Sequence, residues 1–111
     1  MNGRDRIPMT SGVGITFPIC NNLTPTVESC TAKVLEELGE LFQLIGKHKG
    51  ASGEEQTMSP KVWAVQTVLE SIDVAQSAIT LAQTLCEDYT LNFGYLMERH
   101  EDKLKMRGYL K

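Results

Sequence analysis

Two long stretches of this chain repeat apolar residues every three or four positions, and each follows a hydroxyl residue and a proline, at 24–25 and at 59–60. This spacing matches the turn of an α-helix. A Thr or Ser before Pro favours a helix start, because the hydroxyl accepts a hydrogen bond from a free backbone amide and Pro has no amide to leave unpaired. The sequence therefore predicts two amphipathic helices. The first fades through 46–50, and the second runs to about Leu85.

The apolar positions of each helix form a stripe along one face. The stripe of the first helix comprises Val27, Thr31, Val34, Leu38, Leu41 and Ile45, and is widened by Cys30, Leu35 and Phe42. The stripe of the second helix comprises Val62, Val65, Leu69, Ile72, Gln76 and Ile79, with Val68, Ala75 and Ala82 beside it. We expect the two stripes to pack against each other in antiparallel helices.

The rest of the chain has weaker patterns. A third, more charged helix is expected from Thr90 to Arg107, with Gly108 as the residue that ends it. Residues 50–58 are polar and predict a loop, whereas 1–23 are rich in Gly, Pro, Thr and Asn and predict an extended arm before a helical domain at 24–111. No segment alternates apolar and polar residues as a β-strand does. The predicted fold is all-α, an antiparallel helical bundle that oligomerisation completes, because a domain of 111 residues buries only about 60–65% of its unfolded surface and is marginally stable alone.

Composition restricts the function classes. Hydrophobic residues make up 41% and charged residues 23%, which is ordinary for a globular protein. The net charge of −3 provides no basic field for nucleic acid, and no apolar run approaches the ~20 residues that span a bilayer. The cysteines Cys20, Cys30 and Cys86 are too far apart for a metal knuckle or a redox pair. We expect a soluble, cytoplasmic protein without a nucleic-acid or membrane partner.

Acidic residues lie beside both apolar stripes. Glu37 and Glu40 are three residues apart on the first helix, as are Glu70 and Asp73 on the second, so each pair shares a helix face. If the stripes pack antiparallel, four carboxylates converge at the middle of the hairpin. Such a cluster repels itself unless a hard cation neutralises it, and Mg²⁺ prefers oxygen ligands. Solvated surface acids are the alternative interpretation.

Other metals fit this cluster less well. No His or Cys accompanies the acids, which disfavours zinc. A di-iron site would place His, rather than Glu40 and Asp73, at the last positions of the two pairs. A similar pair on the third helix, Glu98 and Glu101, is assigned to the surface. For Trp63 we favour packing or a subunit contact over stacking on a base.

These residues resemble a known family. Glu36-Glu37-x-x-Glu40 followed by Glu70-x-x-Asp73 is similar to the EExxE…ExxD signature of the MazG-like all-α NTP pyrophosphatases. The stretches 33–43 and 68–76 resemble the two metal-binding helices of that family, and 100–109 resembles the basic C-terminal segment of its small members. The resemblance covers about residues 24–111. The connection between the two motifs is long for the family, because residues 50–58 extend it.

The resemblance implies hydrolysis of an NTP or dNTP to the monophosphate and pyrophosphate by a homodimer or homotetramer. It implies Mg²⁺, with Mn²⁺ as a substitute, on the residues that match the family ligands, namely Glu37, Glu40, Glu70 and Asp73. As a hypothesis, Glu36 or Glu40 orients or deprotonates the attacking water. Lys103 and Arg107 share a face of the third helix and are candidates for binding the distal phosphates, with Lys47 a weaker candidate.

Two other functions remain open at this level. The first is a non-catalytic helical dimerisation or adaptor protein, in which the acids only keep the surface soluble. The second is a carboxylate-bridged redox protein. Pyrophosphate release that depends on Mg²⁺ separates the enzyme from both.

Overall fold

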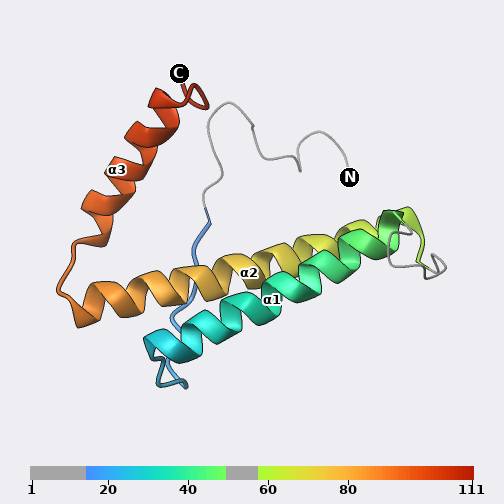
Figure 1. Cartoon of the computed structure of the whole chain (residues 1–111), viewed down its shortest axis with the longest axis horizontal. Coiled ribbons are helices and arrows are strands. Elements are labelled where there is room, and N and C mark those ends of the chain that lie inside the picture. Colours follow the sequence, from blue (N-terminus) through green and yellow to red (C-terminus); the bar gives the residue numbers. More distant parts are fainter. Residues whose placement is uncertain (1–14, 50–57) are drawn as a thin grey trace.

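Three helices and no strand form the described part of the chain, residues 15–49 and 58–111 of this computed structural model (Figure 1). The helices are α1 (Val27–Lys49), α2 (Pro60–Asp88) and α3 (Phe93–Met106). The predicted all-α class is thus confirmed. None of these helices combines the length and the apolar composition that crossing a bilayer requires.

The two long helices begin at hydroxyl caps. At α2 the prediction is confirmed, because Ser59 Oγ accepts a hydrogen bond of 3.2 Å from Val62 N just before Pro60. α1 begins at Val27, later than Thr24 and Pro25 predict. Thr26 Oγ1 accepts from Ser29 N at 3.1 Å, and Ser29 Oγ accepts from Thr26 N at 2.9 Å. This reciprocal pair satisfies two free amides at once and therefore sets the start of the helix.

The third helix is shorter than predicted. It begins after Asn92, whose Oδ1 accepts from Tyr95 N at 3.0 Å, because Thr90 has φ 54° and cannot continue a right-handed helix. The helix therefore begins at Phe93, slightly later than the approximate start predicted near Thr90. The predicted end is confirmed, since Gly108 follows the helix with φ 80°, where a side chain would be strained.

Helices α1 and α2 form an antiparallel hairpin, from which α3 departs without extensive contact (Figure 1). Two interactions fix the pairing at opposite ends. Trp63 Nε1 donates a hydrogen bond of 2.7 Å to the carbonyl oxygen of Leu44, and Cys30 Sγ lies 3.7 Å from Thr84 Oγ1. The start of α2 thus meets the end of α1.

The face of α2 that packs on α1 is not the predicted apolar stripe. The residues that face α1 are Trp63, Glu70, Ser77 and Thr84, of which Ser77 and Thr84 are buried. They recur every seven residues, as a helix–helix contact requires. Most of the predicted stripe stays open instead, with Val62, Val65, Leu69 and Ile72 exposed by 47%, 52%, 57% and 46%, whereas Gln76 and Ile79 are half-buried. The expectation that this stripe forms the core with α1 is wrong for the single chain.

Few apolar side chains are buried in the hairpin. Among the described residues Cys30 is the one buried apolar side chain, and no side chain is completely enclosed. On α1, Leu35 and Phe42 are each 68% exposed. One chain therefore supplies a helical hairpin, and the bundle that oligomerisation completes stays a prediction.

Part of the predicted arm contacts the hairpin. Gln76 Nε2 on α2 donates to the carbonyl oxygen of Pro18 at 3.1 Å, and Cys20 and Leu23 line a groove with both helices. The described residues 15–23 contain no helix, as predicted. The remainder of the arm and nearly all of the predicted polar loop, at 1–14 and 50–57, lie outside the described residues.

We expect Trp63→Phe to lower the free energy of unfolding by about 1 kcal/mol, because it removes the hydrogen bond to Leu44 and leaves that carbonyl without this donor. Urea denaturation followed by circular dichroism measures the change. Tyr109→Phe, which also removes a polar group but from a side chain 71% exposed, is the control and leaves stability unchanged. Equal stability of both variants would show that the indole nitrogen does not fix the pairing.

Candidate metal centre

Three carboxylates from the two long helices converge at the middle of the hairpin. Glu37 on α1 and Glu70 and Asp73 on α2 each offer an oxygen, and these three oxygens lie within 4.8 Å of one another. Glu37 is buried, Glu70 is half-buried and Asp73 is exposed, so the cluster reaches from the helix interface to solvent. The predicted convergence of acids is therefore present for these three residues.

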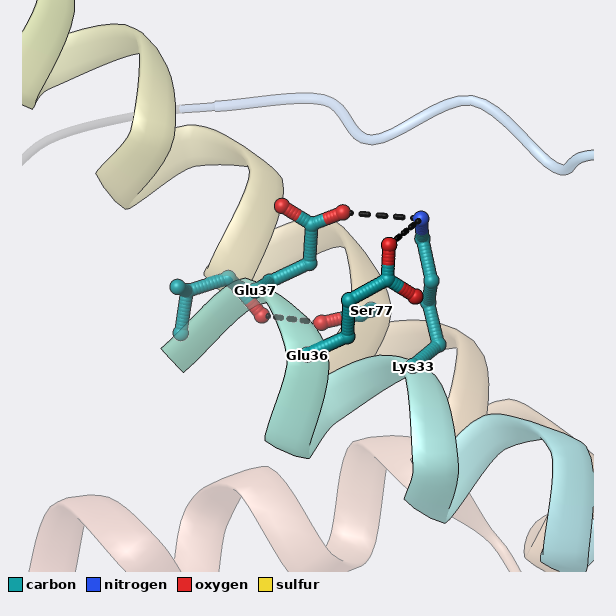
Figure 2. Close-up of polar contacts among 5 residues, drawn as sticks. Lys33, Glu36, Glu37 and Ser77 are labelled. Atoms are coloured by element: carbon teal, nitrogen blue, oxygen red, sulfur yellow. Dashed lines mark hydrogen bonds and ion pairs between the residues drawn. The ribbon is translucent and has the colours of Figure 1, made fainter. Parts of the chain in front are cut away.

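Lys33 neutralises one side of this cluster. Its Nζ lies 2.9 Å from Glu37 Oε1 and 3.5 Å from Glu36 Oε1, as Figure 2 shows. The hydrogen bond to Lys33 lowers the pKa of Glu37, and the same bond raises the pKa of Lys33. Glu37 is thus held as a carboxylate, with one oxygen committed to Lys33.

The remaining oxygens lack donors. Glu37 Oε2 and Glu70 Oε1 are both buried, and neither has a hydrogen-bond partner within the part of the chain that is described. Ser77 lines the same groove as Glu37, but its hydroxyl donates to the carbonyl oxygen of Val74 at 2.8 Å (Figure 2). Buried polar oxygens without donors are costly, so a proton or a cation between them would be stabilising.

The titration of Glu70 agrees with this requirement. The adjacent Glu37 carboxylate raises the pKa of Glu70 from 4.5 to about 7, and burial and the Glu40 carboxylate add to the effect. Repulsion between carboxylates and partial loss of hydration both disfavour the charged form. The protonated form of Glu70 is therefore favoured more than in an isolated carboxyl group, at the place where a cation would bind.

The three carboxylates suit a hard divalent cation. Oxygens on opposite sides of a Mg²⁺ ion are about 4.2 Å apart, because each Mg–O distance is about 2.1 Å. Adjacent oxygens on the ion are about 3.0 Å apart. The oxygens of Glu37, Glu70 and Asp73 lie within 4.8 Å of one another, so side-chain adjustments of up to about 2 Å bring them into range. Mg²⁺ usually keeps several waters and accepts a few carboxylates, and the exposed Asp73 leaves the cluster open to solvent and substrate.

A groove lies on each side of the cluster. The first, of about 370 Å³, is lined by Glu40, Gln43, Leu44, Lys47, Gln66, Leu69 and Glu70. The second, of about 710 Å³, is lined by Cys20, Leu23, Thr24, Pro25, Ser29, Cys30, Lys33, Glu37, Asp73, Gln76, Ser77 and Thr80. We call them the Lys47 groove and the Cys20 groove. Glu70 faces the first groove, and Glu37 and Asp73 face the second.

The other predicted site residues lie at different distances from the cluster. Glu40 is exposed and lines the Lys47 groove with Glu70, but it is not one of the three converging acids. Glu36 lines neither groove and is paired with Lys33. Lys47 lines the first groove. Lys103 and Arg107 line a separate groove on α3 with Arg99 and His100, and α3 lies apart from the hairpin (Figure 1).

Two residues that sequence reasoning did not select lie beside the cluster. Lys33 precedes Glu37 by four residues, a spacing that places both on one face of a helix and that makes the ion pair recognisable. Ser77 follows Glu70 by seven residues and marks the face of α2 that packs on α1. Nothing in the local pattern singles it out, because a small polar residue on a helix is ordinarily read as exposed.

Comparisons of this chain with models of protein families, with curated proteins and with solved structures found no match.

Proposed function

We propose that this protein is a Mg²⁺-dependent hydrolase that cleaves a nucleoside triphosphate, a dNTP or a non-standard NTP, to the nucleoside monophosphate and pyrophosphate. The observation that carries the proposal is the pair of buried, donor-free oxygens on Glu37 and Glu70, beside the exposed carboxylate of Asp73. Bound there, Mg²⁺ would neutralise the triphosphate and polarise water for attack. The resemblance of residues 36–40 and 70–73 to the MazG-like signature supports the same reaction.

The two grooves differ in a way that supports one orientation of the substrate. The Lys47 groove holds a cationic side chain that can meet terminal phosphates. The Cys20 groove is larger, and its lysine, Lys33, is engaged by Glu36 and Glu37. This groove also offers neutral groups, among them Gln76 and Thr80, beside apolar side chains of the arm. In our proposal the distal phosphates lie along the Lys47 groove, the α-phosphate lies at Glu37, Glu70 and Asp73, and the nucleoside lies in the Cys20 groove.

Glu40 is the residue best placed to act on the attacking water. Its carboxylate is exposed and lies in the same groove as Glu70, whereas Glu36 is paired with Lys33. In the reaction the water oxygen forms a bond to the α-phosphorus, and the bond from that phosphorus to the oxygen that bridges to the β-phosphorus breaks. Glu40 takes the water proton, and pyrophosphate leaves with the electron pair of the broken bond.

A nucleotide panel tests this proposal. The purified chain is incubated with normal and modified NTPs and dNTPs, with Mg²⁺ or with EDTA, and both the monophosphate and pyrophosphate are measured. We expect equal amounts of the two products, only with the metal. Release of orthophosphate instead of pyrophosphate, or no turnover with any nucleotide, would overturn the proposal.

We expect Lys47→Ala to raise KM about tenfold or more, because one charge-assisted contact to a phosphate is lost, while kcat falls less. Lys103→Ala is the matched comparison, since Lys103 lies on α3 outside both grooves. Initial rates over a range of nucleotide concentration separate the two parameters. A rise in KM with Lys103→Ala but not with Lys47→Ala would place the distal phosphates at the third helix instead.

A non-catalytic interaction protein remains the alternative function, and the open apolar face of α2 favours it. The two functions differ in their response to metal. Millimolar Mg²⁺ raises the melting temperature of the proposed enzyme, because the ion binds the folded chain alone. An adaptor whose acids only improve solubility shows no such shift.

A further inference from the structure

Residues 15–23, which we call the strap, connect the two long helices on the side of the Cys20 groove (Figure 1). At one end a turn leads the strap into α1, closed by a hydrogen bond of 3.1 Å from Leu23 N to the carbonyl oxygen of Cys20. Further back along the chain the strap reaches α2, where the carbonyl oxygen of Pro18 accepts a hydrogen bond of 3.1 Å from Gln76 Nε2. The strap therefore lies across the groove and is attached on both sides of it.

The side-chain amide of Gln76 is held in one orientation. Thr80 Oγ1 donates its only proton to the backbone carbonyl oxygen of Gln76 at 2.9 Å, so this hydroxyl can only accept from other groups. Gln76 Nε2 lies 3.4 Å from that hydroxyl oxygen and 3.1 Å from the carbonyl oxygen of Pro18. Both neighbours are acceptors, so the nitrogen of the amide, and not its oxygen, faces the strap. Thr80 thus positions the donor that holds the strap on α2.

The strap forms part of the groove wall, yet few contacts hold it there. Cys20 and Leu23 line the groove together with residues of both helices. The side chains of Ile15 and Ile19 are 60% and 73% exposed, so they contribute little apolar burial. The hydrogen bond from Gln76 is itself exposed to solvent. A segment with few buried apolar contacts and exposed hydrogen bonds opens at a low cost in free energy, while the rest of the fold stays intact.

We propose that the strap is a gate over the Cys20 groove, which Gln76 holds closed and which opens to admit a ligand. The groove has a volume of about 710 Å³ with the strap in place, within the range of small-molecule sites. Glu37 and Asp73 line this groove, so the gate also controls access to two of the three converging carboxylates. The inference deepens the proposed function, because the strap covers the groove proposed for the nucleoside. The movement of the strap does not require turnover.

The reactivity of the native cysteines tests the gate. Cys20 and Cys30 line the groove, whereas Cys86 does not. Gln76→Met keeps the length of the side chain and a high helix propensity but removes the donor. The full chain without metal is treated with iodoacetamide, and mass spectrometry of its peptides follows each cysteine separately. We expect Cys20 and Cys30 to react about fivefold faster in the variant, which is the effect of one ordinary hydrogen bond on an opening equilibrium. The rate at Cys86 should stay the same.

Gln66→Met is the matched control, because Gln66 lies on the same helix but lines the Lys47 groove. This variant should change the reactivity of none of the three cysteines. Equal rates at Cys20 and Cys30 in the native chain and in the Gln76→Met variant would overturn the inference. An equal increase at Cys86 would do the same, because the hairpin as a whole would then have loosened.

A second measurement uses the native chain and covers the case in which the Gln76→Met variant does not fold. Cys30 is 5% exposed, so the reagent reaches it only after an opening. Opening of the strap exposes little surface, so low concentrations of urea should leave the rate at Cys30 nearly unchanged. A rate that rises with urea as steeply as global unfolding does would contradict the gate, because the groove would then open only with the whole fold. Neither experiment depends on pyrophosphate release, so the nucleotide panel tests the proposed function separately.

Discussion

Asp73→Asn is expected to lower the turnover number more than 100-fold and to leave the stability of the metal-free protein unchanged or higher. Asp73 supplies one of the three converging carboxylate oxygens. Loss of a residue that only hydrogen-bonds to a metal ligand ordinarily lowers activity about 10–100-fold, and loss of the ligand itself should lower it more. The amide keeps the shape but not the charge, so it also relieves repulsion from Glu37 and Glu70. Glu37→Gln should lower turnover in the same way, but it should also lower stability, because the ion pair with Lys33 is lost. Pyrophosphate release and thermal melting measure the two quantities.

The chain contains a matched control for this experiment. Glu98 and Glu101 repeat the same acidic spacing on α3, where both are exposed and belong to no cluster among the described residues. Glu98→Gln should therefore change neither turnover nor stability. If Asp73→Asn kept full activity, the carboxylate cluster would not be the site. A sharp loss of stability without metal would instead make the carboxylates structural partners.

The affinity for Mg²⁺ is expected to fall about tenfold between pH 8 and pH 6. The pKa of Glu70 is raised to about 7 by the neighbouring Glu37, so below that pH a proton must leave before the cation binds. Isothermal titration calorimetry at several pH values measures the affinity. Repeating the titration in buffers of different ionisation enthalpy counts the released protons. An affinity that stays constant over this range would show that Glu70 does not bind the ion.

The raised pKa of Glu70 also predicts how the stability of the metal-free protein depends on pH. The pKa of Glu70 is higher in the folded chain, about 7, than its ordinary 4.5, so the folded state holds more protons between these values. The contribution of Glu70 is therefore fully present below pH 4.5 and is lost as the pH rises through about 7. Glu37 has the opposite effect on stability. Its pKa is lowered in the folded chain, so its contribution is present above pH 4.5 and is lost as the pH falls below that value. Glu70→Gln should remove the decline between pH 4.5 and 7.

The candidate site was only partly predictable from sequence. Helical spacing was sufficient to place Glu70 beside Asp73, because residues three apart on a helix share a face whatever the fold. Whether Glu37 or Glu40 turns toward them depends on how α1 is rotated about its axis. The structure brings Glu37 into the cluster and leaves Glu40 exposed in the Lys47 groove. The roles assigned to Lys103 and Arg107 stay predictions, and these residues lie apart from both grooves.

Local chemistry in the sequence determined that the chain forms helices and where most of them begin and end. Ser59 before Pro60 and Gly108 after α3 act within one turn, so their effect is the same in any fold. Tertiary structure alone decided which face of α2 meets α1. Both faces satisfy the helical period, and the contact uses Trp63 and Ser77 rather than the more apolar stripe. Which face is used depends on residues far apart in the chain. As a result, most of the apolar stripe stays exposed, and one oxygen each of Glu37 and Glu70 is buried without a hydrogen-bond donor.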